Sequence, residues 1–146
     1  MEPTKIPLQR LDASLPLPKY AYPGDAGVDL RSRTSIVLAP FERAAVPTGI
    51  AVAIPRGYAG LVLPRSGLAL RSGISVVNAP GLIDSNFRGE IQAILVNLDP
   101  HEDFAIEPGD RIAQLMVVKV DDMAFREVDA LDDTERGTAG FGSSGV

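Results

Sequence analysis

Two aspartates stand where a carboxylate can assist a reaction. Asp84 follows the apolar pair Leu82–Ile83 and opens a polar turn, so its carboxylate could take a proton from water. Asp29 lies at the start of the apolar run Val28–Leu30, where it could hold the water shell of Mg²⁺, an ion that keeps several waters. For each aspartate the alternative is an ordinary turn carboxylate that accepts hydrogen bonds from nearby N–H groups.

The segment Pro64–Ala69 carries residue types that bind phosphate. Arg65 can donate two parallel hydrogen bonds to phosphate oxygens, the Ser66 hydroxyl can donate another, and Gly67 lets the backbone approach an anion. The alternative is a capped helix start that binds no ligand. The sequence has no P-loop and no dinucleotide-binding fingerprint, so any nucleotide would be held in another way.

The segment Val77–Glu90 has the pattern of a hairpin. Two strand-like runs flank the turn at Pro80–Gly81, and a second turn is expected over Asp84–Gly89. Backbone groups in a tight hairpin can pair with the edge of a base, and the Asn78 amide can add side-chain hydrogen bonds. An ordinary pair of β-turns remains the alternative.

Polar and aromatic residues also occur near the end of the chain. Gln114 interrupts an apolar run, so it either faces outward or is buried beside a partner such as a phosphate. In the Gly/Ser-rich tail, an aromatic ring can stack on a base and three polar side chains can close over terminal phosphates; these are Phe141, Arg136, Ser143 and Ser144. A disordered end is the alternative for the tail.

Composition limits the class of protein. A chain of 146 residues suits one domain, and a net charge of −5 argues against a general nucleic-acid binder. The absence of cysteine excludes disulfides and zinc sites built on thiolates, and fits a cytoplasmic location. No apolar run approaches a membrane span, and no secretory signal is visible at the start. His101 lies in a polar loop, so a catalytic histidine is not expected.

Short β-branched segments broken by Pro, Gly, Asn and Asp predict an all-β sandwich or barrel that must position these groups. Strands are expected at Ile6–Leu11, Val28–Arg31, Ser35–Leu38, Ala44–Val46, Gly49–Ile54, Ala59–Leu63, Ser75–Asn78, Leu82–Ile83, Glu90–Leu98, Phe104–Ile106, Arg111–Val120 and Ala124–Val128. One short helix is expected, with Ser66 as its cap and Gly73 at its end. Residues 1–128 are predicted to form the core, and residues 129–146 a flexible arm.

Taken together, five segments resemble the five ordered motifs of the trimeric dUTPase family. The strongest are Gly24–Leu30, Pro64–Ala69, Gly81–Gly89, Gly109–Leu115 and Arg136–Gly145, and the resemblance covers roughly Leu15 to Gly145. It implies a jelly-roll β-barrel and a homotrimer whose C-terminal arm crosses to another subunit. It also implies hydrolysis of dUTP to dUMP and pyrophosphate, with Mg²⁺ as cofactor and the nucleotide as the small-molecule partner.

The resemblance assigns a role to each candidate residue. Asp84 would activate the water that attacks the α-phosphorus, and Asp29 would act through metal-bound water. Phosphates would be bound by Arg65, Ser66, Gly67, Gln114, Arg136, Ser143 and Ser144. Uracil would be read by Asn78, the backbone of Leu82 and Ile83, and Gln92, with Phe141 stacked on the base. By resemblance each site draws on three chains.

One position departs from the family pattern, and two other functions stay open. Phe87 stands where the family commonly has Tyr, so the flat face that packs on deoxyribose is kept and a hydroxyl is absent. The related dCTP deaminases place a glutamate where this chain has Ile94, which cannot move protons. A non-catalytic jelly-roll module is the alternative from another class, since a fold does not fix a function.

Overall fold

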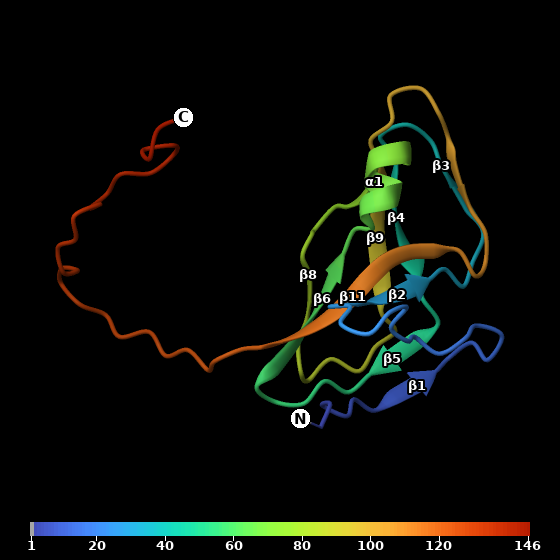
Figure 1. Ribbon diagram of the computed structural model, residues 1–146, viewed down its shortest axis with the longest axis horizontal. Helices are drawn as coiled ribbons and strands as arrows, with labels where there is room; N and C mark the ends of the chain where they lie inside the picture. The colour runs from blue at the N-terminus through green and yellow to red at the C-terminus, as the bar shows by residue number, and fades with distance from the viewer. Residues whose placement is uncertain (1) are drawn as a thin grey trace.

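Residues 2–146 are described by a computed structural model, and they form eleven strands and one helix. In chain order these are β1 Leu8–Arg10, β2 Val28–Arg31, β3 Ile36–Leu38, β4 Arg43–Pro47, β5 Ile50–Val52, β6 Tyr58–Leu63, α1 Ser66–Ser72, β7 Ile74–Val76, β8 Gly81–Ile83, β9 Gln92–Asn97, β10 Phe104–Ile106 and β11 Arg111–Lys119. The expected all-β class is confirmed, because short strands separated by turns make up the ordered core (Figure 1).

The strands pair antiparallel in four small sheets. The largest has the order β2-β11-β6-β8, and a second has the order β4-β9-β7. The pairs β1-β5 and β10-β3 complete the barrel. Strands distant in sequence become neighbours, and the arrangement is the predicted jelly-roll barrel with its single helix at one end (Figure 1). In the largest sheet, β2 and β8 are the two edge strands.

Alternation along β9 separates the core from the surface, as a strand period of two requires. Ala93 and Leu95 are fully buried, whereas Gln92 and Ile94 point to the other face. Inward side chains of both larger sheets meet in one hydrophobic cluster that includes Leu30 of β2. Gln92 and Ile94 therefore share one surface, and that surface forms a wall of the cavity described below.

A fully buried asparagine anchors the loop after β9. The Asn97 amide nitrogen donates to the carbonyl oxygens of Leu38 at 2.9 Å and Glu102 at 2.8 Å. Asp99 then accepts hydrogen bonds from the backbone N–H groups of Glu102 and His101, and these bonds lower the pKa of Asp99. His101 is an exposed residue of this loop, as its polar surroundings predicted.

The helix begins one residue away from the expected place. Arg65 is the N-cap, with extended backbone at φ −86° and ψ 126°, and Ser66 is already the first helical residue. The cap is the last residue with extended backbone, and here that residue is Arg65. The Ser66 hydroxyl therefore does not cap the helix. Gly73 ends the helix in the left-handed conformation at φ 66°, as predicted. No helix within residues 2–146 has the length and apolar character needed to cross a membrane.

One expected pairing and one expected strand are wrong. The runs on either side of Pro80–Gly81 do not form a hairpin, because β7 pairs with β9 whereas β8 pairs with β6. The Val77 N–H donates to the Ile94 carbonyl at 2.8 Å, so the β7–β9 pairing continues before the chain crosses to the other sheet. The strand expected at Ala124–Val128 is also absent. From Asp121 onward every residue is exposed and none belongs to a strand or helix (Figure 1).

Gly60 lets β6 and β8 lie close together, and its replacement by alanine is expected to destabilise the fold. A Cβ at this position would lie 2.7 Å from Ile54 Cδ1 and 3.2 Å from Ile83 Cβ. Overpacking of this kind costs about 1–3 kcal/mol. Denaturant unfolding at equal protein concentration measures the loss. Gly140→Ala, which meets no atom within 4 Å, is the matched control, and equal stability of the two variants would contradict the close packing.

Candidate active site

A cavity of about 370 Å³ lies between β8, the turn after it and the outward face of β9. Six of the residues singled out in the sequence line it: Asn78, Leu82, Ile83, Asp84, Phe87 and Gln92. They come from three separate stretches of the chain. The structure therefore brings together the residues expected to bind the edge of a base, and the proposed general base with them.

The entrance segment of the cavity leaves room for the Asn78 amide. A Cβ on Gly81 would lie 3.4 Å from the Asn78 amide nitrogen and 3.3 Å from Val62 Cβ. The peptide bond between Ala79 and Pro80 is cis. Because position 81 has no side chain, the amide of Asn78 can lie beside the start of β8.

Asp84 is held at the cavity by a braced turn. Its carbonyl oxygen accepts the Phe87 N–H at 3.1 Å, which confirms the turn expected after β8. The Arg88 guanidinium donates to the carbonyl oxygens of Ser85 at 2.7 Å and Phe87 at 2.9 Å. These bonds fix the backbone on the far side of the turn. The Asp84 carboxylate is consequently presented on a constrained loop, although the side chain itself is exposed.

Two carboxylates line the cavity, and their partners distinguish them. Glu90 accepts hydrogen bonds from the Gly49 N–H at 2.9 Å and from Arg33 at 2.9 and 3.1 Å. The Asp84 carboxylate has no hydrogen bond or ion pair within residues 2–146. The Glu90 oxygens are already engaged by these donors, whereas the Asp84 oxygens are free to accept a hydrogen bond from a water molecule, so Asp84 is the better candidate base. Glu90 instead ties the start of β9 to the neighbouring turn.

The Phe87 ring lies over Gly89 at the cavity rim. A Cβ on Gly89 would come within 2.7 Å of the ring atom Cζ, so only glycine leaves space for the ring there. Phe87 remains partly exposed, at 44%. The tip of the ring thus lies against Gly89, and part of the ring stays exposed to a ligand.

The second group of candidates meets at the other edge of the largest sheet. Asp29 on β2 pairs in register with Gln114 on β11, and Gln114 pairs in register with Leu63 on β6. Residues directly opposite each other point to the same face of a sheet. The Arg65 Nε lies 3.1 Å from an Asp29 carboxylate oxygen. Asp29, Arg65 and Gln114 therefore form one cluster, in which Gln114 is half-buried.

The start of α1 lies next to Arg65 and adds further polar groups. Ser66 is exposed, and Gly67 is covered by an arginine from the last turn of the helix. A Cβ on Gly67 would lie 2.9 Å from an Arg71 guanidinium nitrogen. The three residues Arg65, Ser66 and Gly67 are consecutive at one strand-to-helix junction, as their pattern predicted.

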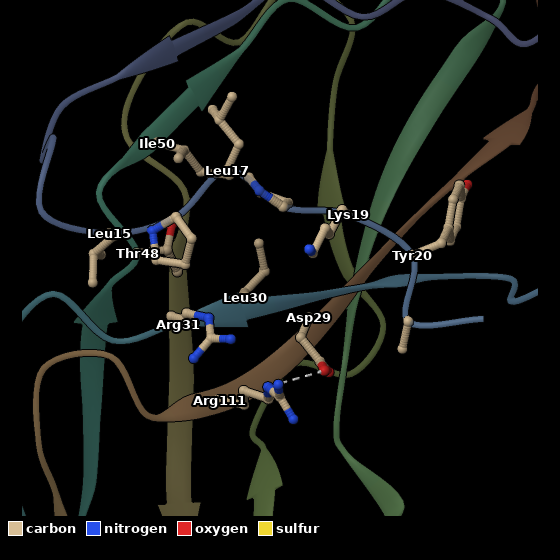
Figure 2. A pocket seen from close by; sticks show the side chains of 13 residues that line it. Leu15, Leu17, Lys19, Tyr20, Asp29, Leu30, Arg31, Thr48, Ile50 and Arg111 are labelled. Carbon is tan, nitrogen blue, oxygen red and sulfur yellow. Dashed lines mark ion pairs between the residues drawn. The ribbon is translucent and has the colours of Figure 1, made fainter.

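Arg111 and Arg88 contribute to the site although no sequence pattern marked them. The Arg111 Nε lies 3.7 Å from the second Asp29 carboxylate oxygen, and both side chains line a cavity of about 230 Å³ (Figure 2). Arg88 stabilises the turn after Asp84 by hydrogen bonds to backbone carbonyl oxygens. Such contacts leave no pattern in the sequence. Position next to a motif residue was the only available signal for either arginine.

The tail residues stay apart from both groups. The segment from Asp121 to the C-terminus extends away from the barrel (Figure 1). Arg136 donates from Nε to the Ala139 carbonyl at 2.9 Å, a contact within the tail. Phe141, Ser143 and Ser144 are exposed. A single copy of the chain does not bring these four residues to the cavity.

Oxygen donors for a metal are sparse in the described part of the chain. Within residues 2–146 no three acidic or histidine side chains gather as a metal cluster. In the cluster of Asp29, Arg65 and Gln114, the one carboxylate is that of Asp29, and its side chain is 23% exposed. Mg²⁺ commonly uses one or two carboxylates together with waters and substrate phosphates, so this donor set fits an ion carried mainly by a nucleotide.

The two groups are far apart within one chain. In the sheet order β2-β11-β6-β8, the edge strands are separated by three spacings, roughly 14 Å at about 4.8 Å each. Asp29 is level with Leu63, whereas Ile83 is level with Gly60, which adds an offset of about 10 Å along the strands. Asp84 and the Asp29–Arg65 pair therefore cannot approach one phosphorus atom within the same copy.

The barrel thus places a base-sized cavity at one edge of its largest sheet and an arginine–carboxylate cluster at the other, the two kinds of site that a nucleotide requires. The family model described as dUTPase matches residues 13–145. The chain therefore belongs to the dUTPase family, and it is a hydrolase. The family predicted from the sequence is confirmed by this match.

Curated relatives and solved structures agree with that assignment. The chain is 58% identical over 140 residues to a Corynebacterium glutamicum protein named deoxyuridine 5′-triphosphate nucleotidohydrolase, covering 96% of this chain and 94% of that one. A Thermobifida fusca protein of the same name is 55% identical over 141 residues, covering 97% and 79%. The Staphylococcus bacteriophage 80alpha dUTPase, solved with dUpNHpp, superposes with a TM-score of 0.90 at 29% identity, covering 99% and 100%.

Proposed function

We propose that the chain hydrolyses dUTP to dUMP and pyrophosphate by attack of water on the α-phosphorus. The observation that carries the proposal is the free carboxylate of Asp84 in the same cavity as the groups suited to a base. The named activity of the relatives and the dUpNHpp complex of the phage enzyme support the choice of a deoxyuridine nucleotide.

Uracil is read by the exposed edge of β8 and by two amides. Because β8 ends the sheet order, the backbone groups of Leu82 and Ile83 that point away from β6 have no strand partner. Such an edge pairs with a ligand as it would with another strand. Asn78 and Gln92 add side-chain amides on two walls of the cavity. We expect a base held against this edge to have no room for a methyl group on C5, so that thymine is excluded.

In the reaction, Asp84 accepts one proton from the attacking water as the water oxygen bonds to the α-phosphorus. The bond between that phosphorus and the oxygen bridging to the β-phosphate breaks. Pyrophosphate leaves, and dUMP keeps the α-phosphate. General base assistance of this kind contributes about 10²–10⁴-fold to a rate.

The phosphates are bound by Arg65, Ser66, Gly67 and Gln114 from the cluster at β2 and β11. Arg65 offers a planar guanidinium for two parallel hydrogen bonds. Asp29 would hold Mg²⁺ through a water molecule. Neutralisation of phosphate charge is the chemistry that Mg²⁺ supplies when bound.

The separation of the two groups supports a site shared between copies. We propose a homotrimer in which one copy supplies the Asp29–Arg65 cluster and a second supplies the Asp84 cavity. The third copy supplies the arm of residues 129–146, which extends from its own barrel. From that arm, Phe141 stacks on uracil, and Arg136, Ser143 and Ser144 close over the phosphates. A native mass of three chains is the expected result.

A nucleotide panel tests the proposed reaction. Pyrophosphate release is measured with dUTP, dTTP, dCTP and UTP, each with Mg²⁺ and with EDTA. Release from dUTP that depends on Mg²⁺ and is much slower with the other nucleotides is expected. Equal cleavage of dTTP would contradict the exclusion of the C5 methyl group. No ammonia release from dCTP is expected, because the cavity wall has Ile94, whose side chain cannot transfer a proton. Ammonia release would indicate a deaminase instead.

Replacement of Phe87 by alanine is expected to weaken sugar discrimination. The ring is held against Gly89, so its free face can pack on the deoxyribose and leave no room for a 2′-hydroxyl. The ratio of kcat/KM for UTP to that for dUTP should rise roughly tenfold, the size of steric discrimination in an apolar pocket. Phe41→Ala, outside the cavity, is the control. An unchanged ratio in Phe87→Ala would show that the ring does not select the sugar.

A further inference from the structure

We propose that Arg111 is a positioning residue that keeps Asp29 and Arg65 in their working arrangement. The inference rests on the proposed function, because it concerns the cluster of Asp29, Arg65 and Gln114 that is proposed to bind the phosphates. Arg111 contacts the cluster twice. Its side-chain Nε lies 3.7 Å from one Asp29 oxygen, and its backbone carbonyl accepts a hydrogen bond from Arg65 Nη1 at 3.3 Å.

An irregularity in the sheet brings the Arg111 side chain to this place. Along β11, Gln114 pairs with Asp29 and Ala113 with Leu30, but Arg111 rather than Ile112 pairs with Arg31. One extra residue is therefore accommodated in β11, as in a β-bulge. Bulges re-aim a side chain and are common beside active sites.

The consequence for the direction of the side chain follows from the strand period. In a regular strand, Arg111 and Gln114 are three residues apart and point to opposite faces. With the extra residue, Arg111 lies opposite Arg31, which shares a face with Asp29 because the two are separated by one residue. Ile112 and Ala113 are both buried, as two consecutive residues at a bulge can be. Figure 2 shows Arg31, Arg111 and Asp29 around the same space.

The two arginines divide the Asp29 carboxylate between them. Arg65 takes one oxygen at 3.1 Å, and Arg111 faces the other at 3.7 Å. Without Arg111, the second oxygen would attract the remaining guanidinium nitrogens of Arg65. Arg65 would then be drawn away from a phosphate. Arg111 thus acts through Asp29 and touches no substrate atom.

A double-mutant cycle tests this role. Arg111→Gln, Asp29→Asn and the double variant are compared with the wild-type protein for kcat/KM on dUTP. Binding of dUpNHpp in EDTA gives a second readout that needs no metal. Arg111→Gln is expected to weaken both by about tenfold, a typical coupling within one ion-pair network. In the Asp29→Asn background the same change should alter either quantity less than about twofold.

Two further variants separate positioning from general charge and from misfolding. Lys19 lines the same cavity without an ion pair to Asp29, so Lys19→Gln should bind dUpNHpp as the wild-type protein does. Arg111→Lys, which restores a positive charge beside Asp29, should recover most of the loss. Melting temperatures are measured for every variant. If Arg111→Gln does not fold, Arg111→Met, which also removes the positive charge, gives the cycle alone and in the Asp29→Asn background.

The possible results are distinct. Equal effects of the Arg111 change in both backgrounds would overturn the inference, because the arginine would then act on substrate or on the fold directly. The same holds if Lys19→Gln reproduces the loss. A wild-type protein that does not cleave dUTP would overturn the proposed function instead. An active wild-type protein with a non-additive cycle supports both.

Discussion

Replacing Asp84 by asparagine is expected to lower kcat for dUTP by about 10²–10⁴-fold, the contribution of a positioned general base. The amide has nearly the same shape as the carboxylate but cannot accept the water proton at neutral pH. The backbone of the turn is held by Arg88 and by the Phe87 N–H, so the cavity should keep its form. Pyrophosphate release measures the rate, and titration with dUpNHpp measures binding, which should stay within about threefold of wild type because the base and phosphate contacts remain.

Glu90→Gln is the informative comparison for Asp84→Asn. Both carboxylates line the cavity, but only Glu90 is occupied by Arg33 and by the Gly49 N–H. Its replacement should lower stability more than it lowers kcat. Asp103→Asn, in an exposed loop, controls for the loss of one negative charge. Full turnover in Asp84→Asn would remove the proposed mechanism.

A chain that ends at Asp133 is expected to fold normally and to lose most of its turnover. Beyond residue 133, the hydrogen bonds of the described structure stay within the tail, so the barrel loses no contact. Stacking of an aromatic ring on a base contributes about 1–3 kcal/mol. A hydrogen bond from arginine to phosphate adds about 1.5–3 kcal/mol. Together these losses correspond to roughly 10²–10⁴-fold in kcat/KM. Circular dichroism melting and pyrophosphate release measure the two properties.

Mixing experiments separate an arm that acts on its own barrel from one that crosses. The truncated chain and full-length Asp84→Asn are each expected to be nearly inactive. After the two are unfolded and refolded together, mixed trimers should contain sites with an intact Asp84 from one copy and an arm from another. Activity should then return. No recovery, with mixed trimers verified by mass, would mean that Asp84 and the arm of each site come from the same copy.

Much of the barrel was predictable because short strands have local signals. Alternation over Gln92–Asn97 marks a half-buried strand, and Gly73 marks the end of a helix by its left-handed backbone. The strand predicted at Ala124–Val128 shows the limit of this reasoning. Its residues have suitable side chains, but a strand needs a partner strand. After β11 the chain leaves the barrel, and no other strand lies beside it.

The candidate site was predictable in its residue types and not in its geometry. Aspartate, arginine and glycine beside turns indicated phosphate chemistry, and the structure gathers them into two groups. The two groups lie at opposite edges of one sheet because of the strand order β2-β11-β6-β8. That order joins strands distant in the sequence, so no local pattern predicts it. The bulge before Ala113 was likewise invisible, since regular alternation would place Arg111 on the face away from Asp29.

The position of β8 at a sheet edge has one more consequence. Unpaired strand edges invite other strands, and soluble proteins usually protect them against aggregation. Here the open edge is only three residues long, Gly81–Ile83, and the Asn78 amide lies beside its first residue. A flat heterocycle can reach those backbone groups, whereas an extended polypeptide cannot run along them. The same hydrogen-bonding edge can therefore stay available for a nucleobase without becoming a point at which chains stick together.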